Sequence, residues 1–282
     1  SRALFNLDQS HKIFKEKGIK AYAKHQQENE HVILEPGVGF TLVKKLLKLN
    51  SKKTPIDVIL LSRNSADTGL RIFNSIEHYD LNISRAAFTR GESTHPFVGA
   101  FEADLFLSSN YNDVQKALQS GYAAASIVES KSNNSHPSQL RIAFDGDAVI
   151  FSDESERIFQ EKGLEAFHEN EILSEKIELK AGPFKSFLVS LQKIQSTFPE
   201  EDNPIRTALV TARSAPSHRR VIHTMRKWGI RIDESFFLGG LEKGVFLRQF
   251  AADIFFDDQQ QHCESASQYV PTGHVPSGIK NS

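Results

Sequence analysis

The stretch Leu140-Arg141-Ile142-Ala143-Phe144-Asp145-Gly146-Asp147-Ala148-Val149 decides how the whole chain is interpreted. Its first five residues form a short apolar run, which predicts a buried strand over 140–144. Asp145 and Asp147 follow that run directly, separated by a glycine. Ligands of open parallel sheets bind at the carboxyl ends of the strands. The stretch therefore predicts a strand that brings two acidic side chains to a binding edge.

The same arrangement recurs downstream of this stretch. Apolar runs predict strands over 207–210, 235–238 and 253–256, and helical spacing predicts helices over 184–197 and 217–228. The polar residues behind these strands are Thr211, Ala212 and Arg213, then Lys243 a few residues after the next strand, then Asp257 and Asp258. Apolar strands that alternate with helices are typical of a parallel sheet covered on both faces. We therefore expect an α/β fold whose polar strand ends meet at one edge.

The predicted edge carries more negative than positive charge. Four carboxylates and one ammonium would meet there, and carboxylates that close raise one another's pKa unless a cation lies among them. Mg²⁺ prefers oxygen ligands and is usually completed by water and a phosphate. We therefore expect a Mg²⁺ site at this edge.

The chain also contains an internal repeat, which indicates two copies of one fold. Residues 11–18 recur as 156–163, and 103–107 recur as 252–256. Between the copies, residues 129–138 form a polar cluster rich in Ser and Asn, which is typical of a linker. We expect an amino-terminal half over 1–128, a linker over 129–138 and a carboxyl-terminal half over 139–282.

These motifs resemble those of a known superfamily. Residues 145–149 resemble the first motif, DxDx[TV], of the haloacid dehalogenase-like (HAD) phosphohydrolases, and Thr211, Lys243 and Asp257-Asp258 resemble the second, third and fourth. Segments 1–5, 25–30 and 32–37 extend the resemblance to the cytosolic 5′-nucleotidase type I family over nearly the whole chain. The resemblance implies a HAD-like Rossmannoid sheet with a small cap-like insertion. It also implies Mg²⁺-dependent hydrolysis of nucleoside 5′-monophosphates.

The resemblance assigns a role to each candidate residue. Asp145 would be the nucleophile, forming an aspartyl-phosphate, and Asp147 the general acid and base. Thr211, the backbone N–H of Ala212 and Lys243 would bind the phosphoryl oxygens. The predicted metal ligands are Asp145, Asp147, Asp257 and Asp258. Arg213 is a candidate for substrate contact, with a surface ion pair as the equal alternative.

The first copy lacks the corresponding chemistry. At the offsets of the repeat, Arg2 replaces Asp147, Ser62 replaces Thr211, Thr94 replaces Lys243 and Ser108-Ser109 replace Asp257-Asp258. We therefore expect a degenerate half that serves as a cap, a substrate wall or a regulatory nucleotide site. In the active half, Phe151 and Phe159 are candidates for stacking on a nucleobase, and the basic residues of 218–227 are expected to face solvent.

Composition excludes several classes of protein. Thirty-four Lys and Arg balance 35 Asp and Glu, for a net charge of −1, which argues against binding to nucleic acid or to a membrane surface. A single cysteine, Cys263, excludes an internal disulfide framework and fits a reducing compartment. We expect a cytoplasmic enzyme. A phosphatase or phosphotransferase acting on another small phosphomonoester, and a non-catalytic nucleotide-binding regulator, remain alternatives, and base preference and oligomeric state stay open.

Overall fold

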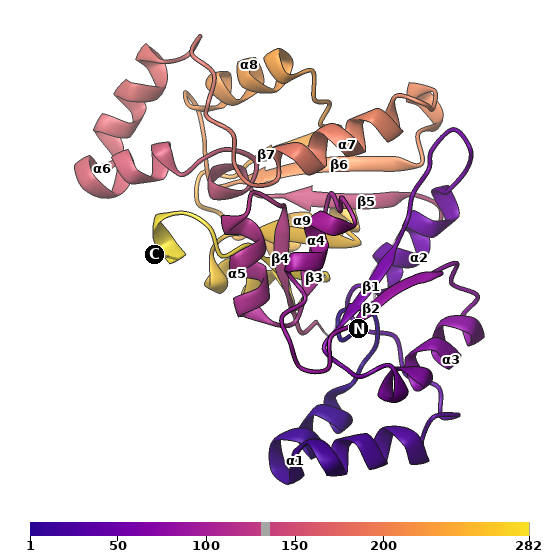
Figure 1. Cartoon of the computed structure of the whole chain (residues 1–282). Helices are drawn as coiled ribbons and strands as arrows, with labels where there is room; N and C mark the ends of the chain where they lie inside the picture. The colour runs from indigo at the N-terminus through magenta and orange to yellow at the C-terminus, as the bar shows by residue number, and fades with distance from the viewer. Residues whose placement is uncertain (131–135, 282) are drawn as a thin grey trace. The chain divides into compact units, whose positions relative to one another are not determined.

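The computed structural model describes residues 1–130 and 136–281 (Figure 1). The chain divides into two compact units, Ser1–Ala103 and Asp104–Ser282. Each unit is described separately below. Among the described residues, no helix combines the length and the apolar character that a membrane span requires.

The first unit contains a small parallel sheet of two strands, β1 and β2, paired from Ile59 with Arg85 to Ser62 with Phe88. Its elements in chain order are α1 (Asp8–Glu28), α2 (Phe40–Leu49), β1 (Ile59–Ser62), the 3-10 turn η1 (Asp67–Gly69), α3 (Leu70–His78), β2 (Arg85–Phe88) and α4 (Pro96–Ala100).

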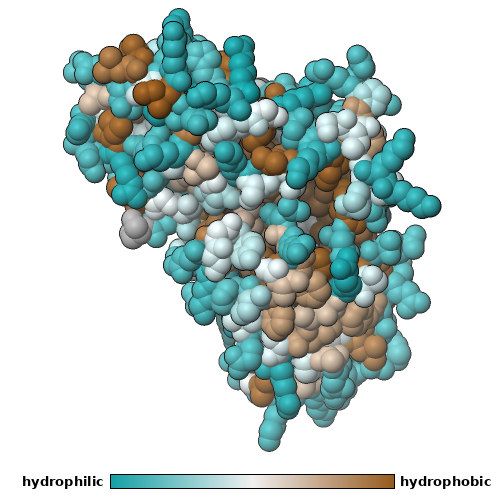
Figure 2. Space-filling model, turned by 45° about the horizontal axis from the view of Figure 1, so that its top comes forward, coloured by the Kyte–Doolittle hydropathy of each residue, from teal (hydrophilic) through white to brown (hydrophobic). Residues whose placement is uncertain are grey.

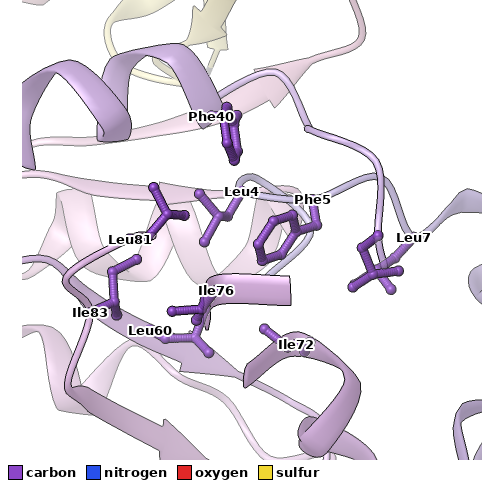
Figure 3. Close-up of a cluster of buried hydrophobic side chains, with 10 residues drawn as sticks. Leu4, Phe5, Leu7, Phe40, Leu60, Ile72, Ile76, Leu81 and Ile83 are labelled. Atoms are coloured by element: carbon purple, nitrogen blue, oxygen red, sulfur yellow. The ribbon is translucent and has the colours of Figure 1, made fainter. Parts of the chain in front are cut away.

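Apolar side chains from distant parts of the first unit form its core. Figure 3 shows Phe5 among residues of the amino-terminal segment, α2, β1 and α3, and the Phe5 side chain is fully buried. The Phe5 ring stacks on Tyr79 with 6.0 Å between ring centroids, and Tyr79 in turn meets Phe40 edge-on at 4.9 Å. Burial of such aromatic rings contributes the largest share of packing energy in small cores.

The second unit is built on a sheet of seven strands in the order β3-β4-β9-β8-β5-β6-β7. Its strands are β3 (Phe106–Ser108), β4 (Ala124–Val128), β5 (Leu140–Phe144), β6 (Ile205–Thr211), β7 (Glu234–Phe237), β8 (Ile254–Asp257) and β9 (Thr272–His274). Its helices are α5 (Tyr111–Gln119), α6 (Glu154–Leu173), α7 (Lys185–Gln195), α8 (His218–Trp228), α9 (Gly244–Phe250) and α10 (Gln260–Ala266), with short turns η2 (Gly146–Ile150), η3 (Glu200–Asp202) and η4 (Ile279–Asn281).

The sheet is parallel except at one junction, where β4 and β9 pair antiparallel. The strands expected over 140–144, 207–210, 235–238 and 253–256 correspond to β5, β6, β7 and β8, and the two expected helices correspond to α7 and α8. The prediction of an α/β fold with a mostly parallel sheet is therefore confirmed.

Neighbouring residues of one strand show that helices cover both faces of this sheet. Phe255 packs in a cluster with Leu247 of α9 and Ala266 of α10. The next residue, Phe256, meets the ring of Phe184, just before α7, at 4.8 Å. Because successive side chains of a strand point to opposite faces, α9 and α10 lie on one face and the start of α7 on the other.

The division into compact units differs in position from the expected halves 1–128 and 139–282. Strands β3 and β4, which precede the expected linker, belong to the sheet of the second unit. Residues 131–135 of that linker lie outside the described residues. The expected halves follow the sequence repeat, whereas the compact units follow packing, so the expected halves stay a prediction.

The repeat has local counterparts in both units. Gly18 interrupts α1 with φ 77° and ψ −176°, and Gly163 interrupts α6 with φ 82° and ψ −177°. Figure 1 shows the resulting bend in both helices. Isolated bridges join Phe5 to Pro36 in the first unit and Phe151 to Ala181 in the second. Backbone angles of this kind are essentially confined to glycine, so both helices bend where the sequence places one.

Candidate active site

The candidate site lies at the carboxyl ends of three adjacent strands of the second unit. Strand β5 runs parallel to β6 on one side and to β8 on the other. Asp145 follows β5 directly, Thr211 is the last residue of β6, and Asp257 is the last residue of β8. The Asp145 N–H donates to the carbonyl of Phe256 at 2.8 Å, which ties the start of the 145–149 loop to β8.

Three carboxylates meet at this edge. One carboxylate oxygen from each of Asp145, Asp257 and Asp258 lies within 4.8 Å of the others, and all three residues are buried. The ammonium of Lys243, also buried, donates to Asp145 Oδ1 at 2.8 Å and to Asp257 Oδ2 at 2.6 Å. The third and fourth sequence motifs therefore join the first at one point.

The charges of the cluster do not balance, and the pKa values reflect this. Burial and the neighbouring Asp145 and Asp257 carboxylates raise the pKa of Asp258 to about 9. Burial likewise raises the pKa of Asp145 to about 6 against the pull of Lys243. Burial would also raise the pKa of Asp257, but Lys243 and His262 outweigh it and lower that pKa to about 2. One ammonium therefore compensates for only part of the negative charge.

The donor set fits a divalent cation. Three buried carboxylates with an excess of negative charge supply the hard oxygen ligands that Mg²⁺ takes. A cation among them would remove the repulsion that raises the pKa of Asp258. Asp145, Asp257 and Asp258 are the residues that could hold such an ion.

Thr211 lies against the loop that carries the first motif. Its hydroxyl oxygen Oγ1 accepts a hydrogen bond from the Arg213 N–H at 3.2 Å. A Cβ at Gly146 would lie 3.3 Å from the same oxygen, a tight contact that would require Thr211 to shift by a few tenths of an ångström. Ala212 is exposed at the end of β6. The second motif thus stands beside the first, as expected from the sheet.

Asp147 has a different partner from the other aspartates. Both of its carboxylate oxygens are bound by Arg213, at 2.8 Å from Nε and 2.7 Å from Nη2. The Asp147 carboxylate is therefore directed to an arginine, and it is not a member of the cluster of Asp145, Asp257 and Asp258. Arg213 itself is 4% exposed, so the expected alternative of a surface ion pair is replaced by a buried one.

Comparison with known proteins assigns the chain to a family. The sequence model of the family described as 5′-nucleotidase matches residues 1–282. The chain belongs to the 5′-nucleotidase family. It is similar to human cytosolic 5′-nucleotidase 1B, with 39% identity over 282 residues that cover 95% of this chain and 46% of the human protein. The chain thus spans about half the length of this relative, and no solved structure matches it.

Two residues beside this candidate site were missed in the sequence. Arg220 of α8, expected on a solvent-facing basic surface, is only 5% exposed and binds Glu171 of α6 at 2.9 Å. That expectation was wrong because two carboxylates of α6, Glu171 and Glu154, face α8 and draw Arg220 inward. Glu171 is buried as well and also binds Arg213. The available signal was the repeat, which aligns Glu171 with the neutral Gln26.

The two aromatic candidates for base stacking differ in exposure. Phe151 is fully buried and packs on Trp228, so it belongs to the core and not to a binding surface. Phe159 on α6 is 43% exposed. Leu164 and Leu173 of the same helix are also exposed. On the face drawn in Figure 2, apolar residues stand among hydrophilic ones at the upper left, the part of the view that α6 occupies in Figure 1.

Proposed function

We propose that this chain is a Mg²⁺-dependent 5′-nucleotidase that hydrolyses nucleoside 5′-monophosphates to a nucleoside and inorganic phosphate. The observation that carries the proposal is the buried cluster of Asp145, Asp257, Asp258 and Lys243 in a chain of the 5′-nucleotidase family. The name of the human relative supports a phosphomonoester at the 5′ position of a nucleoside. A buried anionic site with one lysine is suited to a phosphate only when a cation accompanies it.

Mg²⁺, held by Asp145, Asp257 and Asp258, would neutralise the charge that builds up on the phosphoryl oxygens during transfer. The protein side chains perform the remaining steps. Lys243 lies between Asp145 and Asp257 and keeps both ionised. It also places a positive charge next to the nucleophile, where it can bind a phosphoryl oxygen. The hydroxyl of Thr211 and the backbone N–H of Ala212 would bind others.

Asp145 acts as the nucleophile in the proposed reaction. A carboxylate oxygen of Asp145 forms a bond to phosphorus as the bond from phosphorus to the 5′ oxygen breaks, which leaves an aspartyl-phosphate. A water then attacks the aspartyl-phosphate, and inorganic phosphate leaves Asp145. The hydrogen bond from the Asp145 N–H to β8 and the ion pair with Lys243 support this role, because they hold the residue at a defined position.

Asp147 supplies the proton transfers. It donates a proton to the departing 5′ oxygen in the first step and accepts one from the attacking water in the second. Its position two residues after the nucleophile, and its exposure of about 20% beside the otherwise buried cluster, support this role.

We also propose the finer features of the fold. The second half would be a HAD-like catalytic unit, and residues 1–128 a degenerate copy without its own metal site. Matching glycine bends in α1 and α6 and matching bridges near Phe5 and Phe151 support the duplication. Regulation by a nucleotide and a cytoplasmic location remain predictions.

The test is phosphate release from nucleoside monophosphates, their deoxy forms and several sugar phosphates, each with Mg²⁺ and with EDTA. We expect Mg²⁺-dependent release confined to nucleotides. Asp145→Asn should abolish it without unfolding the protein, whereas Ser108→Ala, at the first-half counterpart of Asp257, should leave it unchanged. Release from sugar phosphates alone would overturn the substrate, and no release from any compound would overturn the enzymatic function.

A further inference from the structure

Behind Asp147 lies a chain of buried charges that the proposed mechanism does not yet use. Arg213 contacts Asp147 through Nε and Nη2, and its Nη1 donates to Glu171 Oε2 at 2.6 Å. Arg220 donates to the other oxygen of Glu171 at 2.9 Å, as does the hydroxyl of Ser155. The Glu171 side chain is fully buried. The 145–149 loop, the segment after β6 that carries Arg213, α6 and α8 therefore meet through these groups.

The first unit contains the same hydrogen-bond framework, but with the neutral Gln26 in place of Glu171. Ser10 donates to Gln26 at 3.2 Å, as Ser155 does to Glu171. Arg71 donates to Gln26 at 3.3 Å, as Arg220 does to Glu171. The two arginines also make matching backbone contacts, Arg71 with the Val32 carbonyl at 2.8 Å and Arg220 with the Ile177 carbonyl at 2.9 Å.

The two units differ where the chain of charges approaches the reacting groups. Gln26 takes the place of Glu171 and Asn64 takes the place of Arg213. The matched bridges Phe5–Pro36 and Phe151–Ala181 put Ser1 at the position of Asp147, rather than Arg2 as the repeat offset predicts. Asn64 receives a hydrogen bond from Tyr22 at 2.8 Å, at the position where the ring of Phe167 lies 5.5 Å from the Arg213 guanidinium. Arg71 and the neutral Gln26 therefore join the corresponding helices of the first unit, without the carboxylate of Glu171. The buried Glu171 and Arg213 charges occur only in the unit that carries Asp147.

We propose that Arg213 is a positioning residue, fixed by Glu171, that holds the Asp147 carboxylate in the orientation required for proton transfer. This inference rests on the proposed function of the same site. A bidentate arginine contact defines both the distance and the plane of a carboxylate, which a lysine cannot do. Arg213 is 4% exposed and all three of its nitrogens are occupied by Asp147 and Glu171, so it acts through Asp147 rather than on substrate.

The test transplants the neutral residues of the first unit into the second. The double variant Glu171→Gln/Arg213→Asn avoids leaving one buried charge without its partner, which would by itself destabilise the fold. Values of kcat/KM are measured with a nucleoside monophosphate and with p-nitrophenyl phosphate. The nucleoside leaves as an alkoxide that needs a proton, whereas nitrophenolate is a stable anion that needs little help. Because kcat/KM reports the steps up to release of the alcohol, loss of proton transfer to the leaving group should lower this value only for the nucleotide.

For the nucleotide, we expect kcat/KM of the double variant to fall about tenfold to a hundredfold, the size typical of a displaced catalytic group. For the nitrophenyl ester, we expect kcat/KM to fall less than about threefold. Asp147→Asn should show the same selectivity with a larger loss. Arg213→Lys, which keeps the charge without the fork, should fall between wild type and the double variant, and it provides the test if the double variant does not fold.

The control is Arg231→Asn, which removes another arginine–aspartate pair of the second unit at the amino-terminal end of β7. It should leave both rates unchanged. Equal losses on both esters in a folded double variant, or no loss on either, would overturn the positioning role. The wild-type rates test the proposed function separately, since a wild type that hydrolyses neither ester would refute that function before any variant is compared.

Discussion

Asp258 is the carboxylate of the cluster whose pKa is raised most. It is 3% exposed and adjoins Asp145 and Asp257, while Lys243 contacts those two and not Asp258. Its pKa is raised to about 9 for these reasons. Without a cation, Asp258 therefore carries a proton when the protein is folded at neutral pH and loses that proton when the chain unfolds.

Replacing Asp258 with Asn should stabilise the metal-free protein at pH 8. The variant removes a group whose ionised form is disfavoured on folding, and each pKa unit corresponds to about 1.4 kcal/mol, so we expect a gain of about 1 kcal/mol or more. The same variant should no longer be stabilised by Mg²⁺. Thermal unfolding with EDTA and with Mg²⁺ measures both effects.

The matched control is Asp202→Asn, at an exposed aspartate of η3. It should change neither the unfolding temperature nor the response to Mg²⁺ by a measurable amount. A metal-free Asp258→Asn variant that is less stable than wild type would contradict the repulsion argued above.

At the scale of elements, α6 exposes the ring of Phe159, which meets the ring of Phe167, itself 5.5 Å from the Arg213 guanidinium. Phe159→Ala should raise KM for nucleotides because base stacking on an aromatic ring is worth about 1–3 kcal/mol. It should leave KM for p-nitrophenyl phosphate, and the unfolding temperature, nearly unchanged. Steady-state kinetics on both substrates measure this.

The repeat supplies the control for this prediction. Phe14→Ala alters the corresponding ring of α1, which is exposed to a similar degree, 46% against 43%. It should have no effect on KM. An equal increase of KM for both substrates in Phe159→Ala would show that α6 affects phosphate binding and not the base.

The segment from Ala181 to Gly182 supports the loop that carries Asp145 and Asp147. A Cβ at Gly182 would lie 2.3 Å from the carbonyl oxygen of Phe151 and 2.5 Å from that of Val149. Gly182→Ala should therefore destabilise the protein by about 1–3 kcal/mol, as overpacking does elsewhere, and should lower activity because the displaced backbone leads to Asp147. Chemical denaturation and phosphate release measure the two effects.

The control is Ala181→Ser, which adds an atom at the neighbouring residue, where the side chain is exposed and has room. We expect it to behave as wild type. A Gly182→Ala protein with unchanged stability and activity would mean that the two carbonyls shift without consequence for the loop.

For the molecule as a whole, the acidic cluster predicts how stability depends on pH. The pKa of Asp145, about 6, and that of Asp258, about 9, both lie above the ordinary value of 3.8. Between 3.8 and these values the folded state binds more protons than the unfolded state, so stability falls as pH rises. Asp257, with its pKa of about 2, acts in the opposite direction, and its contribution is lost only as pH falls below 4.

We therefore expect the unfolding temperature of the metal-free protein to decrease between pH 5 and pH 9. Mg²⁺ should raise it more at pH 8.5 than at pH 6, because the cation replaces protons that are absent at the higher pH. Thermal scans over this range with EDTA or Mg²⁺ measure the difference. A Mg²⁺ effect that does not change with pH would contradict binding at Asp145 and Asp258.

Much of the molecule was predictable from local patterns. Apolar runs that end in Asp145, Thr211 and Asp257 correspond to the carboxyl ends of β5, β6 and β8, because a buried parallel strand needs apolar residues along its length and tolerates polar ones only at its ends. The surroundings of Arg213 and Arg220 were not predictable. Their position beside basic or polar neighbours in the sequence is the same for a solvated arginine and for a buried one.

The sequence by itself determined strands β5 to β8, helices α7 and α8, the repeat, the polar residues at the strand ends and the family. Only the tertiary structure decided which charges are paired. It placed Asp147 on Arg213 and left Asp145, Asp257 and Asp258 together, and it joined β4 to β9 in one sheet. The physical reason is that the two kinds of structure depend on interactions over different distances along the chain. Secondary structure follows from the periodicity of neighbouring residues, whereas the partner of a buried charge is chosen by desolvation and geometry among groups far apart in the chain.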